Sequence, residues 1–252
     1  MENYKLISWA EAQSEYSFNI KVNKASIPSK YLADKLVAVY SGNLEIDTLQ
    51  YKSTCFPYLN NSDVVGIIVE GDLKVTQYVD LRTTDVGFGA HILVQGNFYA
   101  KGLAISGMSE FCIEKDSFIS DFVIGQNAAG GQLTCNGNLH TKHALFDRFS
   151  FKLKGTFEGV LYDLDINNSN IDIPESEEGK VISVMYAADL YCVYSEELED
   201  AEDDDSIDDE EYEGLIRKYA VFEEDSWYYT GGQTQCLLDG KDIFRNIDIQ
   251  LI

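Results

Sequence analysis

The sequence predicts a mainly β protein with a parallel β-helix, or β-solenoid, core and capping segments at its N-terminal and C-terminal ends. A short phrase with a central glycine recurs along the chain, and each copy lies within a strict apolar–polar alternation. Two-residue hairpin turns are scarce between the apolar runs, which favours a coil over a meander. An antiparallel β-sandwich gives similar alternation and remains the alternative.

The recurring phrase is an apolar residue, any residue, Gly, Asn or Asp, and then Leu or Phe. It occupies residues 40–44, 69–73, 94–98 and 135–139, with a relaxed copy at 153–157. A period of two gives a strand one buried face and one exposed face, and the glycine shares the apolar phase. The following Asn or Asp tolerates unusual backbone angles and can hydrogen-bond locally. Each copy therefore predicts a strand, a corner and a second strand.

The spacing of the corners indicates stacked coils of uneven length. Gly96 and Gly137 lie 41 residues apart, which leaves room for two coils. Residues 105–108 and 123–126 resemble degraded copies of the phrase within that interval. Because one coil cannot bury its inner face alone, stacking would create one continuous core.

Residues 64–161, which carry most of these copies, resemble the bactofilin or polymer-forming β-helix group, whose coils carry similar V-x-G-D/N-L phrases. The resemblance implies a β-helix and, in that group, self-assembly. This chain departs from the group in its long non-repeat flanks and uneven coils.

Residues 1–36 are predicted to form an N-terminal capping segment. Ser8 and Glu11 match a capping box that opens a short helix from Trp9 to about Glu15. Residues 18–22 alternate as a strand does, and residues 29–36 are compatible with a helical turn. The β-helix repeat region follows at residues 37–166, interrupted by a loop at 53–63.

Residues 167–252 are predicted to form a C-terminal β segment that contains an acidic loop at 196–213. Residues 181–194 are rich in strand-forming residues, whereas the loop holds 13 acidic residues and no basic ones. Like charges at this density resist packing and stay solvated. The chain after the loop is again apolar and aromatic, so the loop is internal.

The net charge of −24 limits the classes of partner. Such a surface repels nucleic acid and anionic membrane and favours a basic protein. The chain has no apolar run long enough to cross a bilayer and no signal-peptide pattern at its start, which predicts a cytoplasmic protein. Five scattered cysteines without a CxxC pair favour neither a disulfide framework nor a zinc site.

The sequence contains no recognisable catalytic motif, and we expect a protein that is not an enzyme and has no metal and no cofactor. His140 and His143 would point to opposite faces of a strand, which disfavours a shared metal. Asp163 and Asp165 share a face, but chance pairs are expected among 43 acidic residues. The oligomeric state is left open.

These features favour a non-catalytic binding protein. In overall character, though not in any motif, the chain resembles the acidic immunity proteins, or antitoxins, of bacterial polymorphic toxin systems. That resemblance implies a cytoplasmic inhibitor of a basic toxin, such as a nuclease. The predicted partner-binding residues are acidic and aromatic side chains in and after the loop: Asp203, Asp204, Asp205, Asp208, Asp209, Glu210, Glu211, Tyr212, Trp227 and Tyr228.

Two other functions remain as alternatives. One is a bactofilin-like scaffold that self-assembles end to end, which requires uncovered apolar ends. The other is a carbohydrate-active β-helix enzyme, which requires clustered carboxylates in a groove with aromatic platforms.

Overall fold

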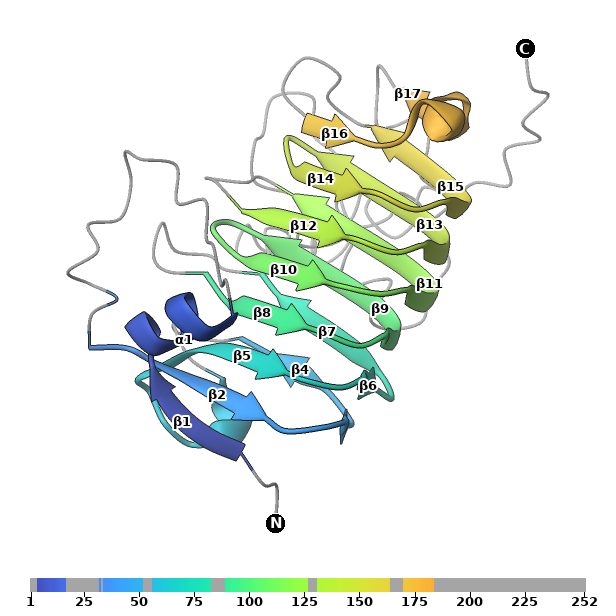
Figure 1. The fold of residues 1–252 in the computed structure, drawn as a ribbon. Helices are drawn as coiled ribbons and strands as arrows, with labels where there is room; N and C mark the ends of the chain where they lie inside the picture. Colours follow the sequence, from blue (N-terminus) through green and yellow to red (C-terminus); the bar gives the residue numbers. More distant parts are fainter. Residues whose placement is uncertain are drawn as a thin grey trace, which may run out of the picture. The chain divides into compact units, whose positions relative to one another are not determined.

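The computed structural model describes residues 4–16, 32, 34–51, 56–82, 89–126, 131–163 and 170–183. All of them lie in the first of two compact units, residues 1–183. This unit is a parallel β-solenoid, which confirms the predicted fold class and makes the antiparallel sandwich wrong (Figure 1). Within the described ranges, no helix has both the length and the apolar character needed to span a bilayer.

One wall of the solenoid, sheet A, is an eight-stranded sheet in the order β1-β2-β5-β8-β10-β12-β14-β16. All neighbouring pairs are parallel except β1 and β2, which are antiparallel. Its strands are β1 Tyr4–Ser8, β2 Leu36–Tyr40, β5 Val64–Val69, β8 His91–Val94, β10 Glu110–Ile113, β12 Gln132–Cys135, β14 Ser150–Leu153 and β16 Asn170–Asp172.

The opposite wall, sheet B, follows the order β17-β15-β13-β11-β9-β6-β3, and β7 joins β4 to β9. Its strands are β3 Leu44–Ile46, β4 Leu49–Gln50, β6 Leu73–Val75, β7 Tyr78–Leu81, β9 Phe98–Ser106, β11 Ser117–Gln126, β13 Leu139–Asp147, β15 Phe157–Asp163 and β17 Val181–Ser183. The core lies between the walls and includes Phe98, Phe111, Phe146, Phe149 and Phe151, each almost fully buried.

Sheet B bends along its length. β6 and β7 are separate strands, yet both pair with β9, so the longer strand continues through the bend. β11 crosses the same bend with a register shift between Ile119 and Phe122, because it carries one more residue there than its neighbours. The alternation of inward-facing and outward-facing residues therefore does not continue unchanged across the bend.

A ladder of Asn and Asp side chains joins the corners between the two walls. Each side-chain Oδ1 accepts a hydrogen bond from a backbone N–H in the next coil, at 2.7–3.3 Å. The successive rungs run from Asn43 to Asp72, Asn97, Asp116, Asn138 and Thr156, and span 29, 25, 19, 22 and 18 residues. The expectation of local hydrogen bonds is wrong, because these side chains lie beside the backbone of a neighbouring coil and not beside their own.

The interval between Gly96 and Gly137 holds two coils, as expected, but the intervening corner is not at a glycine. It lies at Lys115, directly before the ladder residue Asp116. The expected copies at 105–108 and 123–126 are therefore wrong. Gly107 lies in the turn after β9, and Gly125 lies inside β11, where a Cβ atom would meet the Phe149 ring at 2.5 Å.

The predicted helix near the N-terminus is confirmed as α1, Trp9–Tyr16. The Ser8 backbone N–H donates to Glu11 Oε2 at 2.8 Å, and the Glu11 N–H donates to Ser8 Oγ at 3.3 Å, which is the reciprocal geometry of a capping box. Trp9 and Ala12 pack on the outer face of sheet A, where the first coils present apolar side chains (Figure 1).

At both ends of the described stack, additional segments pack on part of the terminal coil. At its start, β1 lies on the edge of β2, and the short helix η2, Pro57–Leu59, brings Leu59 and the adjacent Phe56 into the core. Figure 1 shows this short cyan helix at the β2 end of the stack. At the other end, Glu177 in the helix η3, Glu175–Lys180, accepts a hydrogen bond from the Phe157 N–H at 2.7 Å.

Glu177 supplies the hydrogen-bond acceptor that the corner of a further coil would otherwise provide. In five earlier coils, the first residue after the ladder position donates its N–H to a ladder-residue carbonyl of the next coil. The buried Glu177 carboxylate supplies that acceptor for Phe157, so its N–H is not left unsatisfied. The predicted boundaries at residues 36 and 166 stay predictions, and residues 18–22, 29–31, 33 and everything after 183 lie outside the described residues.

Candidate functional site

A continuous row of side chains runs along the outer face of sheet B. Each member lies two residues after a ladder residue, so the alternation points it away from the core. Neighbouring members are aligned across the parallel strands. We call this the outer row; its residues are Glu45, Lys74, Tyr99, Phe118, His140 and Glu158.

The middle of the outer row is an aromatic stack. The ring centroids of Tyr99 and Phe118 lie 5.2 Å apart with an interplanar angle of 10°, and those of Phe118 and His140 lie 4.8 Å apart at 7°. His140 Nδ1 lies 2.6 Å from Glu158 Oε2, and Lys74 pairs with Glu45 at the other end. Both faces of Phe118 are therefore covered, although the side chain is 37% exposed.

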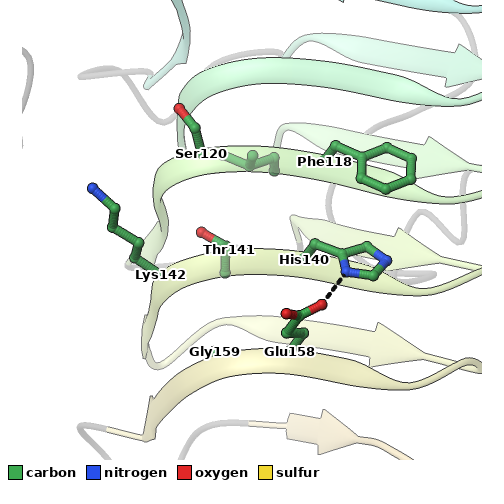
Figure 2. A pocket seen from close by; sticks show the side chains of 8 residues that line it. Phe118, Ser120, His140, Thr141, Lys142, Glu158 and Gly159 are labelled. Atoms are coloured by element: carbon green, nitrogen blue, oxygen red, sulfur yellow. Dashed lines mark hydrogen bonds and ion pairs between the residues drawn. The ribbon is translucent and has the colours of Figure 1, made fainter.

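A shallow groove of about 410 Å³ lies where the outer row meets the bend, over β11, β13 and β15. Figure 2 shows Phe118, His140 and Glu158 on one side of it and Ser120 and Lys142 on the other. Lys142 Nζ lies 3.5 Å from the Asp121 carboxylate. The groove is lined by Phe118, Ile119, Ser120, His140, Thr141, Lys142, Glu158 and Gly159.

The bend corrects the expectation for His140 and His143. Their neighbours Leu139 and Ala144 both belong to the core, so both histidines face outward and not to opposite faces. The register shift between the two residues breaks the alternation. They still lie apart, because His140 stacks on Phe118 whereas His143 stacks on Tyr162 at 6.2 Å.

The described residues do not assemble a recognisable catalytic group. Ser120 and His140 point to opposite sides of the groove in Figure 2, so they do not form a nucleophile–base pair. Burial raises the pKa of the Cys112 and Cys135 thiols to about 12, which keeps them protonated and poorly nucleophilic. Among these residues, no three His, Cys, Asp or Glu side chains are placed to hold a metal ion.

The structure describes only one of the two carboxylates, Asp163 and Asp165, that the sequence places on one face of a strand. Asp163 ends β15 and is 7% exposed, whereas Asp165 lies outside the described residues. The groove offers one carboxylate, Glu158, beside a stack whose central ring, Phe118, is covered on both faces. A sugar-binding platform presents a free aromatic face, so this geometry does not favour the carbohydrate-active alternative.

Charges on the described body are matched only in part. Its residues include 20 Asp or Glu and 11 Lys or Arg. Ion pairs such as Lys74–Glu45, Lys142–Asp121 and Lys152–Asp172 link adjacent coils. Most of the excess negative charge therefore lies outside the described body, and the run 196–213 alone supplies 13 acidic residues.

All ten predicted partner-binding residues, Asp203 to Tyr228, lie outside the described residues, so their placement stays a prediction. The outer row is what the sequence reasoning missed. Its signal is present in the sequence, because every member lies two residues after the ladder Asn, Asp or Thr. The complete row can be recognised only if Lys115 is identified as a corner, and this corner lacks the glycine of the recurring phrase.

The comparisons with known proteins add no relative. The chain has no significant match among family models, curated proteins or solved structures.

Proposed function

We propose that this protein is a non-catalytic binding protein that neutralises a basic protein, as an immunity protein or antitoxin neutralises a basic bacterial toxin such as a nuclease. The proposal places it in the cytoplasm and gives it no nucleic-acid or membrane partner. The single observation that carries it is the contrast between the described body, where 20 acidic residues accompany 11 basic ones, and an acidic run without a single cation.

The contrast matters because ion pairing on the body compensates its charge locally. The run 196–213 contains no Lys or Arg of its own to compensate its carboxylates, so it presents negative charge to an approaching cation. Charge of one sign also accelerates encounter, toward about 10⁸–10⁹ M⁻¹ s⁻¹ at low salt. A nuclease domain is basic where it holds phosphate, and a run of carboxylates can occupy that surface.

The scaffold alternative has less support from the described residues. End-to-end assembly needs open ends, whereas β1 and η2 occupy part of one end and η3 with Glu177 part of the other. The net charge of −24 on each chain adds repulsion between copies.

The test measures the dissociation constant of the complex between this protein and a basic domain at a series of salt concentrations. The basic domain is captured from the native cell or taken from a gene beside this one. The variant replaces the five aspartates of the run by asparagine: Asp203, Asp204, Asp205, Asp208 and Asp209. Exposed ion pairs contribute about 0.2–1 kcal/mol each, so we expect a loss of about 10- to 100-fold and a weaker salt dependence.

A matched control variant neutralises five exposed carboxylates on the described body and should bind nearly as well as the native protein. These are Glu15, Asp34, Asp47, Glu175 and Glu178. If the dissociation constant is unchanged by the five asparagines and by salt, the electrostatic mechanism is wrong.

A further inference from the structure

In the groove beside the outer row, the apolar wall and the negative charge are contributed by different residues. Phe118 is covered on one face by Tyr99 and on the other by His140, so an incoming group meets ring edges only. The edge of an aromatic ring carries partial positive charge, whereas its face carries partial negative charge. The wall can therefore take an alkyl chain by dispersion, but it does not attract a cation.

The negative charge of the groove lies just beyond the stack. Glu158 is 79% exposed at its side chain, and one of its oxygens, Oε2, is held by His140. In the described part of the chain, Oε1 of Glu158 makes no hydrogen bond and stays open to the groove.

The only lysine among the groove-lining residues of the described body is offset by a carboxylate. Lys142 Nζ lies 3.5 Å from Asp121 Oδ1, so the two charges largely compensate each other. Glu158 is then the charge that an incoming ligand meets. Its position, at the end of an apolar wall, suits a ligand with an alkyl stem and a cationic head.

From this geometry we propose that the groove takes an arginine side chain of the basic partner, with the stem along the edges of Phe118 and His140 and the guanidinium on Glu158 Oε1. The inference rests on the proposed function, because it supplies an anchoring contact within the same interface. Arginine fits better than lysine, since its guanidinium is less strongly hydrated and presents several donors in one plane. Buried arginines beside complementary charge are common anchors of protein interfaces.

The test titrates the full-length protein with three acetylated and amidated tripeptides, Gly-Arg-Gly, Gly-Lys-Gly and Gly-norleucine-Gly, and follows NMR shifts of the His140 and Phe118 rings. We expect the arginine peptide to bind with a millimolar dissociation constant. The lysine peptide should bind several-fold more weakly, and the norleucine peptide should not shift these rings.

The decisive variant is Glu158→Gln, which should weaken the arginine peptide about tenfold, as expected for loss of a charge-assisted hydrogen bond. Because this side chain is largely exposed, the variant should fold normally. The matched control is Glu45→Gln at the other end of the outer row, which should bind as the native protein does. Absence of shifts at tens of millimolar, or equal losses in both variants, would overturn the proposal.

The same variants separate this proposal from the one on which it rests. In the partner assay, loss of affinity in Glu158→Gln supports the groove as part of the interface. If the five asparagines in 203–209 weaken the complex and Glu158→Gln does not, the groove proposal is overturned while the proposed function stands. If neither variant affects the complex, both are overturned.

Discussion

The ladder residues at the corners alternate between neutral and charged side chains. Their order is Asn43, Asp72, Asn97, Asp116 and Asn138. Neighbouring coils of a parallel sheet lie about 4.8 Å apart, where like charges repel. An asparagine between two aspartates doubles their separation and still offers the same side-chain acceptor. The alternation therefore keeps the hydrogen-bond ladder while it avoids a column of carboxylates.

Replacing Asn97 by Asp should test this reading, because it creates three adjacent carboxylates without changing the shape of the side chain. We expect a loss of about 1 kcal/mol in the free energy of unfolding, measured by urea denaturation at low salt. The loss should shrink at 1 M salt, where the Debye length is about 3 Å. The control Asp116→Asn keeps an acceptor and removes a charge, so it should not destabilise; equal losses in both variants would contradict the electrostatic explanation.

The corner glycines are required for close approach between coils. A Cβ atom on Gly96 would lie 2.5 Å from the carbonyl carbon and oxygen of Gly71, and backbone atoms cannot move aside as a side chain can. Lys115 occupies the equivalent corner of the next coil, and its ladder rung is the longest, at 3.3 Å. This corner therefore accepts a side chain, and its ladder hydrogen bond is longer than those of the other coils.

We therefore expect Gly96→Ala to destabilise the protein by about 2–4 kcal/mol, through overpacking against fixed backbone. Lys115→Ala is the matched control at the equivalent corner, and it should change stability by less than about 0.5 kcal/mol. Thermal unfolding followed by circular dichroism distinguishes them. Similar unfolding temperatures for the two variants would show that the corner tolerates a Cβ in any coil.

At the scale of elements, α1 covers part of the outer face of sheet A. The carboxyl group of Glu110 lies on this face, beside the buried side chain of His91. Glu110 on β10 is aligned with His91 on β8 and with Gln132 on β12. Trp9 of α1 packs edge-on against His91, with ring centroids 5.0 Å apart. Burial raises the pKa of Glu110 to about 8 and lowers the pKa of His91 to about 3. His91 is thus neutral throughout the range in which Glu110 titrates.

These pKa values predict how stability depends on pH. The unfolded chain releases the Glu110 proton near its ordinary value of 4.5, whereas the folded protein retains it up to about pH 8. The folded state therefore binds more protons in this window, and this group makes stability fall as the pH rises from about 4.5 to 8.

Glu110→Gln removes the titrating group, so its gain in unfolding free energy over the native protein should grow with pH. We expect about 2 kcal/mol at pH 8, discounted for partial exposure, and little at pH 4.5, measured by urea denaturation at both values. Glu114→Gln, an exposed carboxyl nearby, is the control and should give no such trend. A constant difference between Glu110→Gln and the native protein at all pH values would contradict the assignment.

At the scale of the whole molecule, the described unit has additional segments packed at both ends of the stack and more acidic than basic residues. β1 lies on one sheet edge, Phe56 and η2 reach the core at the same end, and Glu177 replaces a missing corner at the other. A solenoid stays separate from its copies when its terminal coils offer no free apolar surface or unpaired backbone. The remaining negative charge keeps copies apart at low salt.

Multi-angle light scattering should therefore give a constant mass between 0.05 and 1 M salt. Salt removes the repulsion, so only the segments packed at the ends can prevent stacking at the upper value. A mass that rises with protein concentration at 1 M salt would favour the scaffold alternative over the binding protein. The variant Glu177→Ala, which uncovers the Phe157 N–H, provides a positive control for an opened end.

Part of the site was predictable from the chain and part was not. The positions of Tyr99, His140 and Glu158 follow from their place after a ladder residue, and the alternation alone points them outward. The stack itself depends on Phe118, which follows a corner built on Lys115 and so lacks the glycine that marks the others. The groove depends on the extra residue in β11, and the apolar–polar alternation of the sequence does not reveal this insertion.

The sequence by itself determined strands with one buried face and corners marked in most coils by glycine, which favoured a coil without excluding an antiparallel sandwich. It also determined the helix Trp9–Tyr16, through a capping box whose partners lie three residues apart. Only the tertiary structure decided which acceptor each ladder side chain serves, where the bend falls, and how Glu177 closes the stack. The physical reason is distance along the chain: these contacts join residues 18 to 29 positions apart, and uneven coil lengths hide their register until the coils are stacked.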